Sequence, residues 1–260
     1  MNTITQASVS KNNSLLETFT DIWQAIDRKT LLWVSLFGVA FGLVECAVVV
    51  YIRELYYPNG FGFPLVAIST RVIKTELWRE AATLLMLASV GYIAGKNKVQ
   101  RFAYFLVSFA VWDIFYYVFL KLILKWPESM LTWDILFLLP IAWIGPVVAP
   151  IILSLLMIVL AILLLYKNIA LILREWILLL SGAFVSIVSF TWEYVHFLSS
   201  HSHQSDTGEQ IMHLSLTYVP QHYPWWIFFI SLFLIGASMF LYTVRVSKRQ
   251  RKLAEMQLFI

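Results

Sequence analysis

Six segments of about twenty mostly apolar residues dominate the sequence, and each is long enough to cross the hydrocarbon core of a bilayer as a helix. Hydrophobic residues make up 60% of the chain and charged residues only 13%, a balance that excludes an ordinary soluble domain. The sequence therefore predicts an all-α polytopic transmembrane helical bundle, forming a single integral membrane domain over residues 1–260. About six spans are expected, at residues 31–53, 76–95, 102–124, 147–166, 176–198 and 224–245.

Basic residues set the predicted orientation, because loops rich in Lys and Arg usually face the cytoplasm. With the N-terminus inside, 13 of the 19 basic residues fall on the inner side: Lys11, Arg28, Lys29, Lys96, Lys98, Arg101, Lys167, Arg174, Arg245, Lys248, Arg249, Arg251 and Lys252. We therefore expect both termini to be cytoplasmic. Residues 1–30 are predicted to be a cytoplasmic or interfacial segment that is not a cleaved signal peptide, and residues 246–260 a basic tail that contacts anionic lipid rather than nucleic acid.

The apolar run at residues 133–150, WDILFLLPIAWIGPVVAP, does not fit a simple span. It contains three prolines and a glycine, and an interior proline removes a helix hydrogen bond and clashes with the preceding turn. We expect a broken or re-entrant segment here: a short half-helix, a break, and then the fourth span. Such breaks can expose backbone carbonyl groups at a binding site, or they can simply pack.

Several carboxylates occur inside the apolar segments, where each costs roughly 3 kcal/mol on insertion scales. They are Glu45, Glu76, Glu80, Asp113 and Glu193, the last followed three residues later by His196. The predicted topology places all of them in the outer half of the bilayer. A shared cavity open to the outer face is the simplest interpretation.

Two kinds of chemistry fit this group. Glu193 and His196 have the Glu-x-x-His spacing of di-iron helical bundles, and Glu45, Glu76, Glu80 and Asp113 could complete a site for a divalent metal ion, although a second Glu-x-x-His pair is absent. Alternatively, the acids could form interhelical ion pairs with three basic residues of the spans: Arg53, Arg79 and Lys121. In the first span, Gly38 and Gly42 have the small-xxx-small spacing that permits close approach of a neighbouring helix.

The predicted outer loop between the fifth and sixth spans is rich in histidine. His201, His203 and His213 could capture a metal ion or sense the outer pH, since the reference pKa of histidine lies near 6.5. A loop of this composition could also be merely solvated. The only cysteine, Cys46, excludes an intramolecular disulfide and every multi-cysteine metal motif.

Residues 109–150, FAVWDIFYYVFLKLILKWPESMLTWDILFLLPIAWIGPVVAP, resemble an uncharacterised family of bacterial polytopic integral membrane proteins. The resemblance covers about a sixth of the chain. It implies a location in the bacterial inner membrane, and it brings no activity, cofactor or catalytic residue with it.

Three functions remain compatible with these patterns. The first is an inner-membrane protein whose acidic and histidine cluster binds a metal ion or carries protons, in transport or in a membrane redox system. The second is a membrane-embedded metalloenzyme acting on a lipid-soluble substrate, with Glu193 and His196 as ligands or as acid and base. The third is a non-catalytic subunit or assembly factor with membrane protein partners, in which the cluster only fixes helix packing.

Overall fold

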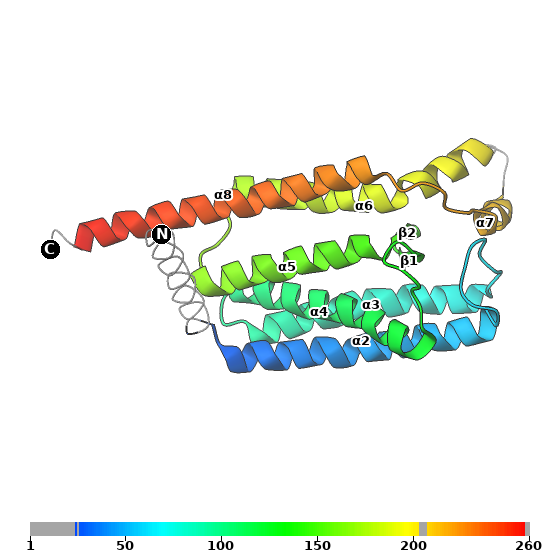
Figure 1. Ribbon diagram of the computed structural model, residues 1–260, viewed down its shortest axis with the longest axis horizontal. Coiled ribbons are helices and arrows are strands. Elements are labelled where there is room, and N and C mark those ends of the chain that lie inside the picture. The colour runs from blue at the N-terminus through cyan, green and yellow to red at the C-terminus, as the bar shows by residue number, and fades with distance from the viewer. Residues whose placement is uncertain (1–23, 25, 203–206, 258–260) are drawn as a thin grey trace, which may run out of the picture.

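The computed structural model describes residues 24, 26–202 and 207–257. Within them the chain forms seven helices and one two-stranded sheet (Figure 1): α2 (Arg28–Tyr56), α3 (Thr70–Ala94), α4 (Lys98–Leu124), β1 (Trp133–Phe137), β2 (Trp143–Pro146), α5 (Val148–Lys167), α6 (Leu173–His201), α7 (Gly208–Leu216) and α8 (Trp225–Gln257). Most of the predicted segment 1–30 lies outside the described residues. Each of the six predicted spans coincides with one long helix.

Five helices are long and apolar enough to cross a membrane: α2, α4, α5, α6 and α8. Their outward faces carry large apolar side chains, such as Phe184 and Phe233, that are mostly exposed. Apolar faces of this extent need a non-aqueous surrounding, which identifies a multi-pass membrane protein. The remaining long helix, α3, lies beside α4 but has a charged N-terminal half, so a count of six spans stays a prediction.

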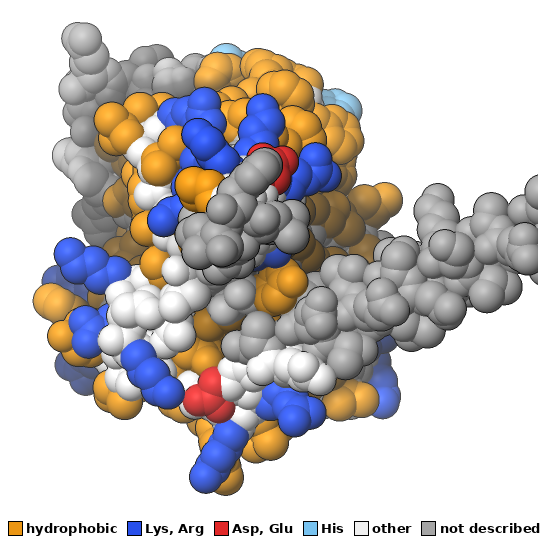
Figure 2. All heavy atoms as spheres, turned by 90° about the vertical axis from the view of Figure 1, so that its left-hand side faces the viewer, with side chains coloured by type: hydrophobic (Ala, Val, Ile, Leu, Met, Phe, Trp, Pro, Cys, Tyr) orange, Lys and Arg blue, Asp and Glu red, His pale blue; other side chains and the backbone are white. Residues whose placement is uncertain are grey.

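The long helices run antiparallel, so the bundle has two distinct ends (Figure 1). One end, called here the hairpin end, holds β1, β2, α7 and the 57–69 connection. The opposite end is called the basic end, because it gathers the side chains of Arg28, Lys29, Lys96, Lys98, Arg101, Lys167, Arg174, Arg245, Lys248, Arg249, Arg251 and Lys252. Figure 2 views this end, where blue basic side chains far outnumber red acidic ones.

Helix α2 packs closely on α4 through two glycines. A Cβ atom at Gly42 would lie 3.0 Å from the carbonyl oxygen of Trp112, and one at Gly38 would lie 2.9 Å from the Cβ of Val111. Side chains larger than hydrogen would push the two helices apart. The predicted role of the small-xxx-small spacing is confirmed.

The predicted half-helix at residues 133–146 is wrong. This stretch forms an antiparallel β-hairpin in which Asp134 pairs with Gly145 and Ile135 with Ile144. Pro140 lies in the connection between the strands, where its missing N–H leaves no ladder bond unmade. The break itself was correctly placed, since α5 begins at Val148 and carries Pro150 in its first turn, where proline is tolerated.

Helices α6 and α8 form a second layer, separated from α2, α3 and α4 by α5 (Figure 1). Gly182 allows their close approach, because a Cβ atom there would lie 3.1 Å from the carbonyl oxygen of Ser231. A hydrophobic cluster that includes Tyr104, Leu160 and Leu164 fills the bundle toward the basic end. This half of the molecule is therefore a packed core.

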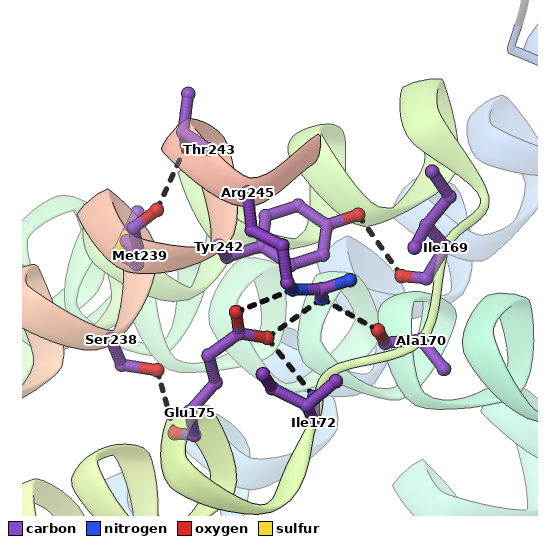
Figure 3. A network of polar contacts seen from close by, with 9 residues as sticks. All are labelled: Ile169, Ala170, Ile172, Glu175, Ser238, Met239, Tyr242, Thr243 and Arg245. Carbon is purple, nitrogen blue, oxygen red and sulfur yellow. Dashed lines mark hydrogen bonds and ion pairs between the residues drawn. The ribbon is translucent and has the colours of Figure 1, made fainter. Parts of the chain in front are cut away.

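A buried ion pair fixes α8 to the start of α6 at the basic end (Figure 3). Both carboxylate oxygens of Glu175, whose side chain is fully buried, accept hydrogen bonds of 2.8 Å from the guanidinium group of Arg245. Glu175 also accepts from the backbone N–H of Ile172, and Arg245 donates to the carbonyl oxygen of Ala170. The hydroxyl group of Tyr242 adds a bond to the carbonyl oxygen of Ile169. The α5–α6 connection is thus held by α8.

Candidate functional site

A cavity of about 620 Å³ lies at the hairpin end of the bundle. Its walls come from the C-terminal half of α2, the 57–69 connection, the N-terminal half of α3, the middle of α4, the hairpin, and α7. Seven acidic and guanidinium side chains line it: Glu45, Glu76, Glu80, Asp113, Asp134, Arg53 and Arg79. Five carboxylates against two guanidinium groups leave an excess of three negative charges when every group is ionised.

Arg79 holds two of these carboxylates. Its guanidinium group contacts Glu45 of α2, and it also bonds to Glu76 one turn earlier on α3, at 2.7 and 2.8 Å. The hydroxyl group of Thr83 donates a 2.6 Å hydrogen bond to the other oxygen of Glu45. Thr83 and Arg79 of α3 thus both contact Glu45 of α2, and ion pairing by Arg79 is confirmed.

Arg53 neutralises a carboxylate that the sequence reasoning did not single out. Its Nη2 atom donates a 3.1 Å hydrogen bond to Asp134 in β1, and Tyr117 donates another at 3.3 Å. The guanidinium carbon lies 4.3 Å from the ring centroid of Phe61 and 3.8 Å from that of Trp126. Burial raises the pKa of Asp134 to about 6, and the neighbouring Arg53 opposes that rise. Asp134 could have been found as the one acidic residue within the apolar run 133–150.

The third basic residue of the predicted ion pairs, Lys121, does not pair with the acids. It donates to the backbone carbonyl groups of Lys125 and Pro127 instead, at 3.3 and 2.8 Å. Asp113, Tyr117 and Lys121 lie on one face of α4 because they are spaced four residues apart. The exposed ammonium group of Lys121 nevertheless bonds at the helix end, where free carbonyl groups are available. Lysine pairing was therefore a wrong prediction.

Two cavity carboxylates have only neutral hydrogen-bond partners within the described residues. Both oxygens of Glu80 accept from the backbone N–H of Leu138, at 3.0 and 2.9 Å. Asp113 accepts a 2.8 Å hydrogen bond from the hydroxyl group of Ser154 in α5. The charge of Arg79 acts on Glu80 from nearby, but no cation of the described residues bonds to either carboxylate. A buried carboxylate without a bonded cation is neutralised by a proton or a bound cation. Glu80 and Asp113 are therefore the two carboxylates of the cavity that can bind a proton or another cation.

Apolar and aromatic side chains form the rest of the wall. Phe61 and Tyr57 come from the end of α2 and its connection, while Trp112 and Tyr116 come from α4. The Tyr57 hydroxyl group accepts a hydrogen bond from the backbone N–H of Val66, and burial raises the pKa of this tyrosine. The cavity is therefore lined both by acidic side chains and by aromatic and apolar side chains that favour apolar groups.

The predicted partners on α6 lie elsewhere. Glu193 is half-buried and His196 is exposed, and neither lines the cavity, although Tyr194 between them does. The cavity thus brings together Glu45, Glu76, Glu80 and Asp113 but not the Glu-x-x-His pair of Glu193 and His196. Over residues 26–202 and 207–257, no three His, Cys, Asp or Glu side chains are grouped to hold a metal ion. A metal site therefore stays a prediction.

The histidines of the predicted outer loop also separate. His213 of α7 lines the cavity, at its exposed edge. His201 ends α6, where its Nδ1 atom lies 2.9 Å from the carbonyl oxygen of Phe197. His203 lies outside the described residues. Of the two histidines that the structure describes here, His201 and His213, only His213 lines the cavity.

Comparison with known proteins finds no matching family model, no similar curated protein and no similar solved structure. The function is therefore inferred from the chemistry of the cavity and from its place in the bundle.

Proposed function

We propose that this protein is a multi-pass protein of a bacterial inner membrane whose acid-rich cavity takes up and releases protons or another cation. The basic end is the cytoplasmic side in this proposal, in accordance with the positive-inside bias, and the basic tail after residue 245 contacts anionic lipid. The hairpin end then faces outward, together with the mouth of the cavity.

A single observation carries the proposal: Glu80 and Asp113 line the cavity with neutral hydrogen-bond partners only. Intramembrane acids without a basic partner commonly mark proton or ion pathways. Their environment favours binding of a positive charge, and the cavity provides the route by which it arrives.

The packed core toward the basic end sets a requirement for transport. The residues of that hydrophobic cluster, such as Leu160 and Leu164, do not line the cavity. Passage to the cytoplasmic side therefore needs a second conformation in which this core opens, as in alternating access. A protein that only binds the cation and hands it to a partner subunit needs no such change.

The alternative of a purely structural cluster has its own support. Arg79 joins α2 to α3 through Glu45, and Arg53 joins α2 to the hairpin through Asp134. Those four residues have the pairing expected of packing elements. Glu80 and Asp113 lack such pairing. Substitutions at these two residues, compared with substitutions at the four paired ones, therefore distinguish cation binding from a structural role.

Proton movement in proteoliposomes tests the proposal. Purified protein is reconstituted with a pH-sensitive dye inside, and a membrane potential is imposed. The wild type and Glu54→Gln, which removes an exposed carboxylate from α2 outside the cavity, are expected to acidify the lumen at equal rates. Glu80→Gln and Asp113→Asn are expected to lower the rate at least tenfold. A wild-type rate equal to that of protein-free liposomes would refute proton carriage.

Elemental analysis tests the separate metal hypothesis. A stoichiometric divalent ion in the purified wild type, lost in both Glu193→Ala and His196→Ala, would establish a metal site on α6. Retention of such an ion in these variants and its loss in Glu80→Gln would place the cation in the cavity instead. Wild-type protein that is folded and metal-free would end the metalloenzyme hypothesis.

A further inference from the structure

The size of the cavity constrains its natural occupant. About 620 Å³ is far more room than a proton or a single bare ion requires, and it falls within the range of about 300–1,000 Å³ seen for small-molecule sites. A cavity that served protons alone would need only a chain of polar groups or water. The volume therefore indicates an organic guest.

The negative charge of the cavity wall determines which charge the guest can carry. After Arg79 and Arg53 are paired with their carboxylates, Glu80 and Asp113 remain with an N–H or O–H donor as their only partner in the described part of the chain. An anion would be repelled by both. A neutral guest would leave both desolvated, whereas a protonated amine would form charge-assisted hydrogen bonds with them.

Two unpaired donors give a second, independent indication of a guest. Arg53 and Trp112 both line the cavity and are more than nine-tenths buried, with exposed fractions of 7% and 8%. The Nη1 atom of Arg53 and the Nε1 atom of Trp112 have no hydrogen-bond partner among the described residues. Buried N–H groups are nearly always paired, so these donors require an acceptor that the described chain does not supply. An oxygen atom on the guest, or water accompanying it, meets that need.

The aromatic walls are compatible with the same guest. The rings of Trp112, Tyr116 and Phe61 line the cavity, and their faces attract cations as well as apolar groups. Leu77 and Ile141 add aliphatic surface on other sides. An alkyl or aryl body therefore finds a suitable surface next to the acidic groups.

We propose that the cavity binds an organic ammonium compound with an apolar body, a protonated amine directed to Glu80 and Asp113, and an oxygen acceptor. This assignment deepens the proposed function and rests on the same two carboxylates. It differs from that function by requiring recognition of a molecule rather than of a proton.

Calorimetric titration of the protein in nanodiscs tests the ligand class, with empty nanodiscs subtracted. The probes are phenylalaninol, the diol in which a hydroxyl group replaces its amine, and phenylpropionate. The wild type is expected to bind phenylalaninol at least tenfold more tightly than the diol, and not to bind phenylpropionate. This comparison needs no variant, so it is unaffected by any folding defect. Equal binding of amine and diol would overturn the proposal.

Matched variants locate the bound amine. Glu80→Gln and Asp113→Asn are each expected to weaken phenylalaninol binding at least tenfold and to leave diol binding unchanged, while Glu54→Gln binds like the wild type. Unchanged amine binding in both cavity variants would overturn the assignment. Proton movement without amine binding would overturn the ligand class and uphold the proposed function. Amine binding that is lost in both variants, with no proton movement in liposomes, would uphold the ligand class and overturn proton carriage.

Discussion

Replacement of Arg245 by methionine should destabilise the protein strongly, because it removes the cation from a buried ion pair. The substitution preserves much of the aliphatic stem while deleting both 2.8 Å bonds to Glu175 and the 2.9 Å bond to the carbonyl oxygen of Ala170. The fully buried Glu175 side chain then keeps only the backbone N–H of Ile172, at 3.0 Å. A buried carboxylate in this state is an uncompensated charge.

The magnitude follows from the exposure of the pair. Removing one partner of a buried ion pair costs about 3–5 kcal/mol, and since 21% of the Arg245 side chain is exposed to solvent, the lower limit applies. A loss of about 3 kcal/mol lowers the folding equilibrium constant roughly a hundredfold. The double variant Glu175→Gln with Arg245→Met should recover part of that loss, because the glutamine carries no charge.

Titration with sodium dodecyl sulfate in mixed micelles measures this free energy through tryptophan fluorescence, and the 11 tryptophans of the chain supply the signal. Lys248→Met is the matched control, since it removes an exposed basic residue from the same helix. We expect it to change the free energy of unfolding by less than about 0.5 kcal/mol. An Arg245→Met effect no larger than this control, or a double variant less stable than the sum of its single changes, would refute the reasoning.

Three further predictions concern packing, the hairpin and topology. Gly42→Val should cost about 1–3 kcal/mol in the same titration, because its Cβ atom would lie 3.0 Å from a carbonyl oxygen of α4; unchanged stability would contradict the glycine contact. Asp134→Asn should lower the melting temperature, since it leaves the buried guanidinium group of Arg53 without its counter-charge, and an unchanged melting temperature would count against that pairing. Cysteines placed at Asn97 and Gly60 should react with an impermeant maleimide from the cytoplasmic and outer sides, respectively, and reversed labelling would invert the proposed orientation.

The helices, and a close helix contact at Gly38 and Gly42, could be predicted from the sequence because their signals are local. Apolar length places a helix, and glycine at Gly38 and Gly42 permits backbone contact wherever the neighbouring helix lies. The position of the break before Pro150 was equally local. The strand pairing of Asp134 with Gly145 was not, because it depends on register across a turn rather than on periodicity along a helix.

The candidate site was also predicted only in part. Depth in the predicted spans correctly grouped Glu76 and Glu80 with Glu45 and Asp113 in one cavity. Spacing does not give the rotation of one helix about its axis relative to its neighbours. Glu193 was therefore assigned to a cavity that its helix reaches only through the adjacent Tyr194.

The polarity of α3 has a consequence for how the chain enters the membrane. Its first eleven residues include five charged ones, Arg71, Lys74, Glu76, Arg79 and Glu80. A charge at a helix centre adds about 2.5–3.5 kcal/mol to the free energy of insertion, and although these charges lie toward one end of α3, together they disfavour insertion of the helix by itself. Its C-terminal half packs on α4, with Gly91 against the backbone of Phe105. In the predicted six-span topology, the insertion of α3 therefore depends on its packing against α4 and is expected only after α4 has been synthesised.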